Sequence, residues 1–182
     1  PMAPVNVDDE TSRTTAPAPL TPVLMGREQA IDPSTNLPTL VAAQAQATPL
    51  RIAVESGERR LTYAGMVQRI DALAGHLVES GVTRGELIGI CVPRGVELPI
   101  AALGVQRAGA AYVALDPSYP EERLLDIAGQ SALRRIITVA PGDVPAAVAD
   151  GRELVELDQL DLRRPVTAQL PVLHGDDLAY VL

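Results

Sequence analysis

Apolar residues between positions 62 and 81 recur every three or four residues, which is the spacing of one face of a helix. The positions on this face are Met66, Ile70, Leu73 and Leu77. This periodicity predicts an amphipathic helix that packs against a core. Thr62 is a suitable N-cap in front of the pattern, and Gly81 is a suitable terminator behind it.

Short apolar runs typical of buried strands alternate with helical patterns along the rest of the chain. Strands are predicted at residues 51–56, 86–92, 112–115, 135–139, 153–158 and 178–182. Helices are predicted at residues 38–48, 96–108 and 121–131, a weaker helix or loop at 141–151, and a connection at 161–177. Regular alternation of this kind indicates an α/β fold, with a mainly parallel sheet covered by helices and right-handed crossovers.

The first 36 residues show no sustained periodicity and are rich in proline, threonine and serine. We interpret residues 1–36 as a linker or extended tail, and residues 37–182 as the folded region. Within the tail, residues 20–31 contain enough apolar side chains to lie against a folded surface, and both arrangements remain open.

Composition restricts what can fill the core. Hydrophobic residues make up 47% of the 182-residue chain, aromatic residues only 2%, and phenylalanine and tryptophan are absent. Leucine, valine, isoleucine and alanine must therefore fill the interior, which suits helices packed on a buried sheet. Cys91, the single cysteine, lies in the apolar run LIGICV, so we expect a buried strand thiol and no intrachain disulfide.

The net charge disfavours several partners. All 15 basic residues are arginine, and 23 acidic residues leave a net charge of −8, which argues against nucleic acid or an anionic membrane as a partner. No apolar stretch approaches the roughly 20 residues of a membrane span. Asp8, Asp9 and Glu10 stand where a secretion signal would have positive and apolar residues. We predict a cytoplasmic protein.

An α/β pattern raises the question of a phosphate-binding loop. Gly104 and Gly109 have the outer spacing of such a loop, but Ala110 and Ala111 follow where lysine and serine or threonine are needed. These glycines also close a predicted helix instead of opening one. The dinucleotide fingerprint G-x-G-x-x-G is absent after every predicted strand. The residues therefore do not indicate a free-standing nucleotide-binding enzyme.

The remaining polar candidates favour structural roles. Asp116 follows a predicted strand, where a ligand contact is conceivable, but in a Pro-rich turn we expect it to accept backbone hydrogen bonds. Arg94 and Glu97 could face a ligand, with a solvated ion pair as the preferred interpretation. The other candidates are His76, His174, Pro120, Glu121 and Glu122. The histidines lack partners for a triad or metal site, and the last three suit the start of a helix. We assign no catalytic, cofactor-binding or metal-binding residue.

Three ordered motifs resemble the opening of an amino-acid adenylation (AMP-binding) domain of the non-ribosomal peptide synthetase type, in the adenylate-forming superfamily. Residues 61–66, LTYAGM, are similar to the family motif LTYxEL, and residues 106–124, QRAGAAYVALDPSYPEERL, to LKAGxAYVPLDPxYPxERL. LAYVL at residues 178–182 is similar to the strand that precedes the family's phosphate loop, YTSGSTGxPKG. Gly65 replaces the usual glutamate, which implies a weaker helix start, and Ala114 replaces proline.

The resemblance implies that residues 37–182 are the first part of the large N-terminal subdomain, ending before the phosphate loop. Enzymes of this family join an amino acid to ATP, with Mg²⁺, release pyrophosphate, and transfer the aminoacyl group to a carrier-protein thiol. Their phosphate loop, substrate pocket and catalytic lysine lie downstream of the positions matched here. We therefore expect this chain alone to be inactive and to bind no ATP or Mg²⁺.

The resemblance also implies partners, namely the remainder of the adenylation domain, a carrier protein and a small accessory protein. Two further hypotheses remain open. The chain could be a non-catalytic interaction module derived from an adenylation domain, or an intact binding domain for an adenine nucleotide. Because the expected sheet would leave strand edges and an apolar face uncovered, we also expect self-association or a partner.

Overall fold

The computed structural model of the chain describes residue 32 and residues 34–182. The linker predicted for residues 1–36, including the apolar stretch at 20–31, lies outside the described residues except for Asp32 and residues 34–36. Within the described part of the chain, no helix is both long enough and apolar enough to cross a membrane.

Helix α1 (Leu37–Ala47) has a reciprocal cap at its start. The Asn36 side chain accepts a hydrogen bond from the Thr39 amide at 3.0 Å, and the Thr39 hydroxyl accepts one from the Asn36 amide at 3.4 Å. Pro38 occupies the first turn, where its missing N–H group costs nothing. The helix predicted at residues 38–48 is confirmed.

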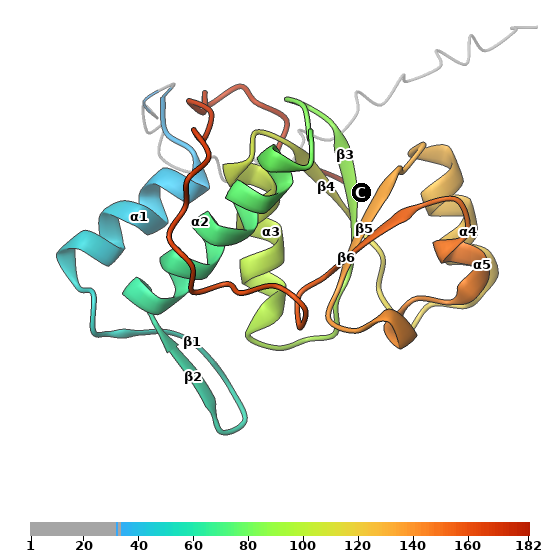
Figure 1. Ribbon diagram of the computed structural model, residues 1–182, viewed down its shortest axis with the longest axis horizontal. Coiled ribbons are helices and arrows are strands. Elements are labelled where there is room, and N and C mark those ends of the chain that lie inside the picture. The colour runs from blue at the N-terminus through green and yellow to red at the C-terminus, as the bar shows by residue number, and fades with distance from the viewer. Residues whose placement is uncertain (1–31, 33) are drawn as a thin grey trace, which may run out of the picture. The chain divides into compact units, whose positions relative to one another are not determined.

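A two-stranded hairpin follows, formed by β1 (Ile52–Ser56) and β2 (Arg59–Thr62). The strands are antiparallel, and Gly57 makes the turn between them with a φ of +59°. This left-handed conformation is one that glycine adopts without strain. The strand predicted at residues 51–56 is confirmed, and the hairpin stands apart from the main sheet (Figure 1).

Helix α2 (Tyr63–Glu79) matches the predicted periodicity. The Thr62 hydroxyl accepts a hydrogen bond from the Gly65 amide at 3.2 Å, as an N-cap should. Gly81 has a φ of +82°, and the next amide, that of Val82, reaches back to the Leu77 carbonyl at 3.0 Å, which closes the helix. The buried side chains of α2 include the four predicted apolar positions.

The main sheet has five strands, and every pair of neighbouring strands is parallel. Its members are β3 (Leu87–Cys91), β4 (Ala111–Ala114), β5 (Arg135–Thr138), β6 (Glu153–Glu156) and β7 (Tyr180–Val181). Their order across the sheet is β6-β5-β3-β4-β7. The predicted α/β class and mainly parallel sheet are confirmed.

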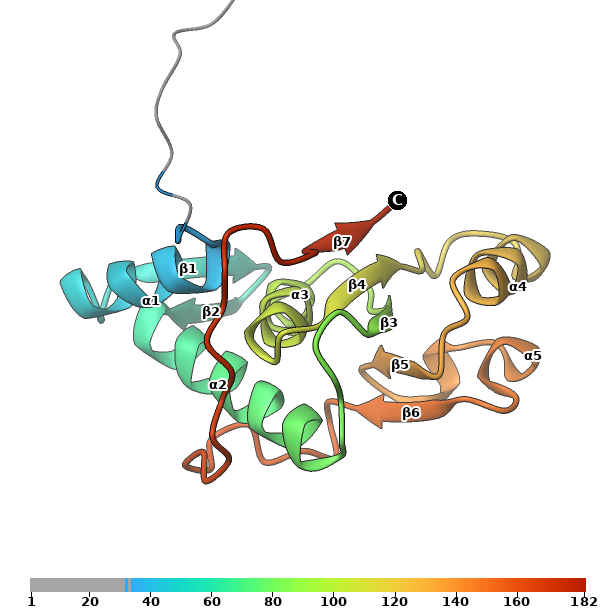
Figure 2. The same cartoon turned by 90° about the horizontal axis from the view of Figure 1, so that it is seen from above.

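Helices cover both faces of this sheet, with α2 and α3 on one side and α4 and α5 on the other (Figure 2). The elements not yet bounded are α3 (Glu97–Arg107), α4 (Glu121–Gln130), the 3₁₀ turn η1 (Pro141–Asp143) and α5 (Ala146–Ala149). Side chains of β3 alternate between the two layers. Ile88 and Ile90 belong to the apolar cluster of α2 and α3, whereas Cys91 belongs to that of α4 and α5.

Helices α2 and α3 pack closely because a glycine lies at their contact. A Cβ atom on Gly104 would stand 2.6 Å from Cδ2 and 2.9 Å from Cγ of Leu73, which is fully buried. The absence of a side chain at this position therefore lets the two helix backbones approach. Gly104 is therefore a packing residue inside α3, and the prediction that it closes this helix is wrong, because the helix continues to Arg107.

Residues 158–179, which we call the return segment, carry the chain back across α2 to the opposite edge of the sheet (Figure 1). This segment forms no helix or strand, which confirms the predicted connection at residues 161–177. Ion pairs fasten it at both ends, between Arg164 and Glu79 and between Arg84 and Asp177. It delivers β7 to its place beside β4, where the rings of Tyr112 and Tyr180 stack with centroids 5.7 Å apart.

The amino-terminal edge of the sheet is held by a largely buried arginine. Arg135, at the start of β5, pairs with Glu86 at 2.5 Å and with Glu153 at 2.8 Å. It also donates a hydrogen bond to the Ser80 carbonyl at 2.9 Å. The Arg135 and Glu86 side chains are only 11% and 12% exposed. This network joins the starts of β3, β5 and β6 to the end of α2.

Candidate functional site at the carboxyl edge of the sheet

The two central strands β3 and β4 send the chain to opposite faces of the sheet, β3 to α3 and β4 to α4. In parallel sheets, ligands commonly bind outside the carboxyl ends of strands whose connections diverge in this way. A crevice of about 700 Å³ lies there. It is lined by Ile90, Val92, Pro93, Arg94, Leu98, Ala114, Leu115, Asp116, Pro117 and Ser118.

Asp116 takes the turn role that its Pro-rich surroundings predict. One carboxylate oxygen accepts a hydrogen bond from the Ser118 amide at 2.9 Å. Hydrogen bonds from the Ser118 backbone and hydroxyl lower the pKa of Asp116, and the positive charge of Arg94 adds to the effect. The carboxylate is therefore ionised at neutral pH and fixes the loop after β4.

The preferred interpretation of Arg94 and Glu97 as an ion pair with each other is wrong. Among the described residues, Glu97 pairs with Arg59 of the hairpin instead. Arg94 is exposed and faces the crevice near Asp116. The sequence could not reveal the true partner, because Arg59 and Glu97 are 38 positions apart and no local spacing relates the start of β2 to the start of α3.

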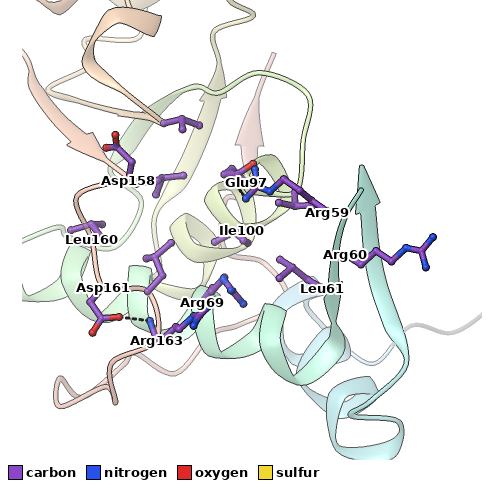
Figure 3. A pocket seen from close by; sticks show the side chains of 14 residues that line it. Arg59, Arg60, Leu61, Arg69, Glu97, Ile100, Asp158, Leu160, Asp161 and Arg163 are labelled. Carbon is purple, nitrogen blue, oxygen red and sulfur yellow. Dashed lines mark hydrogen bonds and ion pairs between the residues drawn. The ribbon is translucent and has the colours of Figure 1, made fainter. Parts of the chain in front are cut away.

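A second cavity, of about 660 Å³, lies between the hairpin, α2, the start of α3 and the beginning of the return segment (Figure 3). Four arginines line it, and Arg60 turns away toward Glu55. We call this cavity the arginine cleft, after Arg59, Arg69 and Arg163 on its wall. Sequence reasoning missed it, because these residues come from three separate segments and no local spacing relates them.

The remaining candidates lie in or directly beside the elements predicted for them, although His76 is in the last turn of its helix and not midway along it. Gly109 has a φ of +79° directly after α3, so it ends a helix and does not open one. Glu121 and Glu122 lie in the first turn of α4. The His174 amide donates a hydrogen bond to Asp177 at 2.8 Å. In the described part of the chain, no three His, Cys, Asp or Glu side chains are grouped closely enough to hold a metal ion.

Cys91 ends β3 beside the crevice and is fully buried, as predicted. Burial raises the pKa of the thiol to about 11, and the negative charges of Asp143 and Asp116 add to the shift. Below pH 9 the folded protein therefore holds Cys91 as the unreactive thiol.

We expect native protein at pH 8 to incorporate iodoacetamide at least a hundred times more slowly than protein unfolded in urea, because alkylation requires an exposed thiolate. Mass spectrometry of timed samples measures both rates, and chemical reduction beforehand excludes oxidised protein. Comparable rates in the two states would show that Cys91 is accessible in the native chain.

Comparison with known proteins identifies the family of this chain. Residues 41–181 match the family model described as AMP-binding enzyme. The chain belongs to this family. It is 44% identical over 137 residues to a linear gramicidin synthase from Brevibacillus parabrevis, covering 74% of this chain and 3% of that protein. It is 34% identical over 160 residues to bacitracin synthase 3 of Bacillus licheniformis, covering 83% of this chain and 2% of that protein.

Solved structures agree with this AMP-binding assignment. The N-terminal subdomain of NpsA from Klebsiella oxytoca superposes with a TM-score of 0.69 at 25% identity, covering 80% of this chain and 37% of that chain. FmoA3, a non-ribosomal peptide synthetase solved with AMPPNP, gives 0.70 at 29% identity, covering 80% of this chain and 16% of that chain. The chain is thus the N-terminal part of an adenylation domain of the peptide synthetase type, and spans a small part of the curated relatives it matches.

The described residues do not by themselves fit ATP and Mg²⁺. Gly104 lies inside α3 against Leu73, Gly109 ends that helix, and all 15 basic residues of the chain are arginine. No loop among the described residues combines the glycines and lysine of a phosphate-binding loop.

Proposed function

We propose that the chain forms the N-terminal part of an amino-acid-activating domain in non-ribosomal peptide biosynthesis, and that its role there is structural. The complete domain would convert an amino acid and ATP into an aminoacyl adenylate and pyrophosphate, and would then transfer the aminoacyl group to a carrier-protein thiol. The observation that carries this proposal is the match of residues 41–181 to AMP-binding enzymes, together with their ordered parallel sheet.

In this proposal, the residues of this chain position the groups that do the chemistry. β7 lies next to β4 and parallel to it, so a loop that follows β7 would emerge at the same edge as the crevice between β3 and β4. When bound, ATP and Mg²⁺ would supply the activated phosphoryl group and its charge compensation. The hydrogen bond that Asp116 accepts from the Ser118 amide would hold the neighbouring loop rigid.

We expect the 182-residue chain alone to show no amino-acid-dependent exchange of pyrophosphate into ATP. Adenylation needs cations and backbone donors together around the phosphates of ATP, and the described residues contain no glycine-rich loop with a lysine to supply both. The test assays a homogeneous preparation with each of the common amino acids, with a complete adenylation domain in parallel as the positive control. Robust exchange by the chain would contradict this expectation.

The second candidate function is a non-catalytic interaction module, and an exposed apolar surface favours it. Leu37, Leu178 and Tyr180 are about half exposed, and they line a common cavity of about 250 Å³ where α1 meets the end of the return segment. A native mass spectrum of the purified protein tests this function. A stable complex with a carrier protein or a small accessory protein, formed without nucleotide, would support it. A monomer that binds neither would contradict it.

A further inference from the structure

Two arginines on the wall of the arginine cleft, Arg69 and Arg163, form no ion pair among the described residues, although the whole chain has a net charge of −8. Arg69 projects from α2 and Arg163 from the return segment, and their side chains lie beside one another (Figure 3). Like charges held this close repel each other unless an anion or a carboxylate compensates them. The positions of the acidic groups around the cleft therefore decide whether these two charges are already compensated.

Three carboxylates line the cleft, but none lies within ion-pair distance of Arg69 or Arg163 among the described residues. Glu97 is engaged by Arg59. Asp161 accepts a hydrogen bond from the backbone amide of Arg163 at 3.0 Å and so stabilises its own turn. Asp158 is exposed at the opposite side of the cleft (Figure 3). The two guanidinium groups are left without an acidic partner.

The Arg69 side chain is held in place by the backbone of its own helix. One of its terminal nitrogens donates a hydrogen bond to the Gly65 carbonyl at 2.8 Å, one turn back along α2. Partial burial lowers the pKa of Arg69, and the charges of Arg163 and Arg59 lower it further, while Glu97 opposes them. The Arg69 guanidinium is thus fixed beside two other arginines, and its hydrogen bond to Gly65 is the one that it makes among the described residues.

The floor of the cleft is apolar. It is built from Leu61, Val96, Ile100, Val139, Leu157, Leu160 and Leu162. A volume of about 660 Å³ is within the range of small-molecule sites, which is roughly 300–1,000 Å³. An occupant that satisfies both surfaces would have a compact apolar body and a strongly anionic end.

We propose that the arginine cleft is a binding site for a phosphate group, carried by a small organic phosphate ester whose apolar part rests on the leucine-rich floor. A phosphate dianion can accept hydrogen bonds from two guanidinium groups and compensate both charges, whereas a carboxylate compensates one. Arg69 and Arg163 bind the phosphate, and Arg59 closes the side of the site through its ion pair with Glu97. The proposal does not depend on the adenylation chemistry.

Calorimetric titration of the 182-residue chain with phenyl phosphate at pH 8 and constant ionic strength tests this site. We expect one saturable site, and about tenfold weaker binding after either Arg163→Gln or Arg69→Gln, since each removes a charged hydrogen-bond donor. Arg163→Gln is the cleaner variant, because its side chain is exposed and folding should be unaffected. Arg60→Gln is the matched control, since Arg60 points away and pairs with Glu55, and its binding should equal that of the wild type.

Titrations with benzoate and with inorganic phosphate measure separately what the ring and the phosphate group contribute to binding. Benzoate, with a similar ring but a single charge, should bind about tenfold more weakly than phenyl phosphate. If inorganic phosphate binds as tightly as phenyl phosphate, the cleft is still a phosphate site, but its ligand is the free ion and not an ester. Absence of saturable binding, equal binding by wild type and both cleft variants, or an equal loss in Arg60→Gln would overturn the proposal.

Discussion

Replacing Arg135 with methionine is expected to lower the free energy of unfolding by about 3 kcal/mol, the low end of the range for breaking a buried ion pair from one side. The side chain of Glu86 is only 12% exposed, and Arg135 is its ion-pair partner at 2.5 Å. Without the guanidinium, that carboxylate remains desolvated and unpaired, and the Ser80 carbonyl loses its donor. Urea unfolding followed by circular dichroism measures the change.

The neighbouring residue provides the matched control. Arg134 is exposed, and no ion pair involves it among the described residues, so Arg134→Met should change the free energy of unfolding by less than about 0.5 kcal/mol. Adding Glu86→Gln to Arg135→Met removes the stranded charge and keeps an acceptor for Thr83, and should recover at least about 1 kcal/mol. A loss below about 1 kcal/mol in Arg135→Met, or no recovery in the double variant, would show that the network contributes no more than a surface pair.

Replacing Gly104 with alanine is expected to destabilise the protein by about 1–3 kcal/mol, although alanine is the better helix former. The new methyl group would stand 2.6 Å from Cδ2 of Leu73, closer than carbon atoms can approach without a shift. Leu73 is fully buried in the cluster that joins α2 to the sheet, so its side chain has no free space to enter. The two helices must therefore separate.

Gly129 offers the same substitution in another helix. It lies in α4 with open space around the position of a Cβ atom, so Gly129→Ala should stabilise the protein by about 0.5–1 kcal/mol. Leu73→Ala leaves a cavity that can accommodate the methyl group of Gly104→Ala. The double variant should therefore lose less free energy of unfolding than the sum of the losses in the two single variants. Equal effects at Gly104 and Gly129, or strict additivity with Leu73→Ala, would contradict the proposed close contact.

Local signals in the sequence were sufficient to predict most of the fold. The spacing of Ile70, Leu73 and Leu77 identified α2, because one helical face must be apolar to pack on a sheet. Regular alternation of strands and helices predicted a parallel sheet, since parallel neighbours require crossovers. The order β6-β5-β3-β4-β7, by contrast, is not encoded in any local pattern, because it depends on which face each connection crosses.

The candidate sites were less predictable, because they are built from contacts between distant segments. Asp116 could be interpreted correctly, since its partner Ser118 is two residues away in the same turn. Arg59 and Glu97 could not be paired, and Arg69 and Arg163 could not be brought together, because no spacing rule connects positions on a hairpin, two helices and an extended return segment. Sequence patterns report local geometry, whereas such clefts arise from tertiary packing.

The stacked rings of Tyr112 and Tyr180 also make the last strand of the sheet observable without a label. The chain has four tyrosines and no tryptophan, so its near-ultraviolet signal is not dominated by indole. Two of these four chromophores are held 5.7 Å apart with planes inclined by 25°, a geometry in which their electronic transitions couple. Because one ring belongs to β4 and the other to β7, this coupled optical signal reports whether the return segment has carried β7 to its place in the sheet.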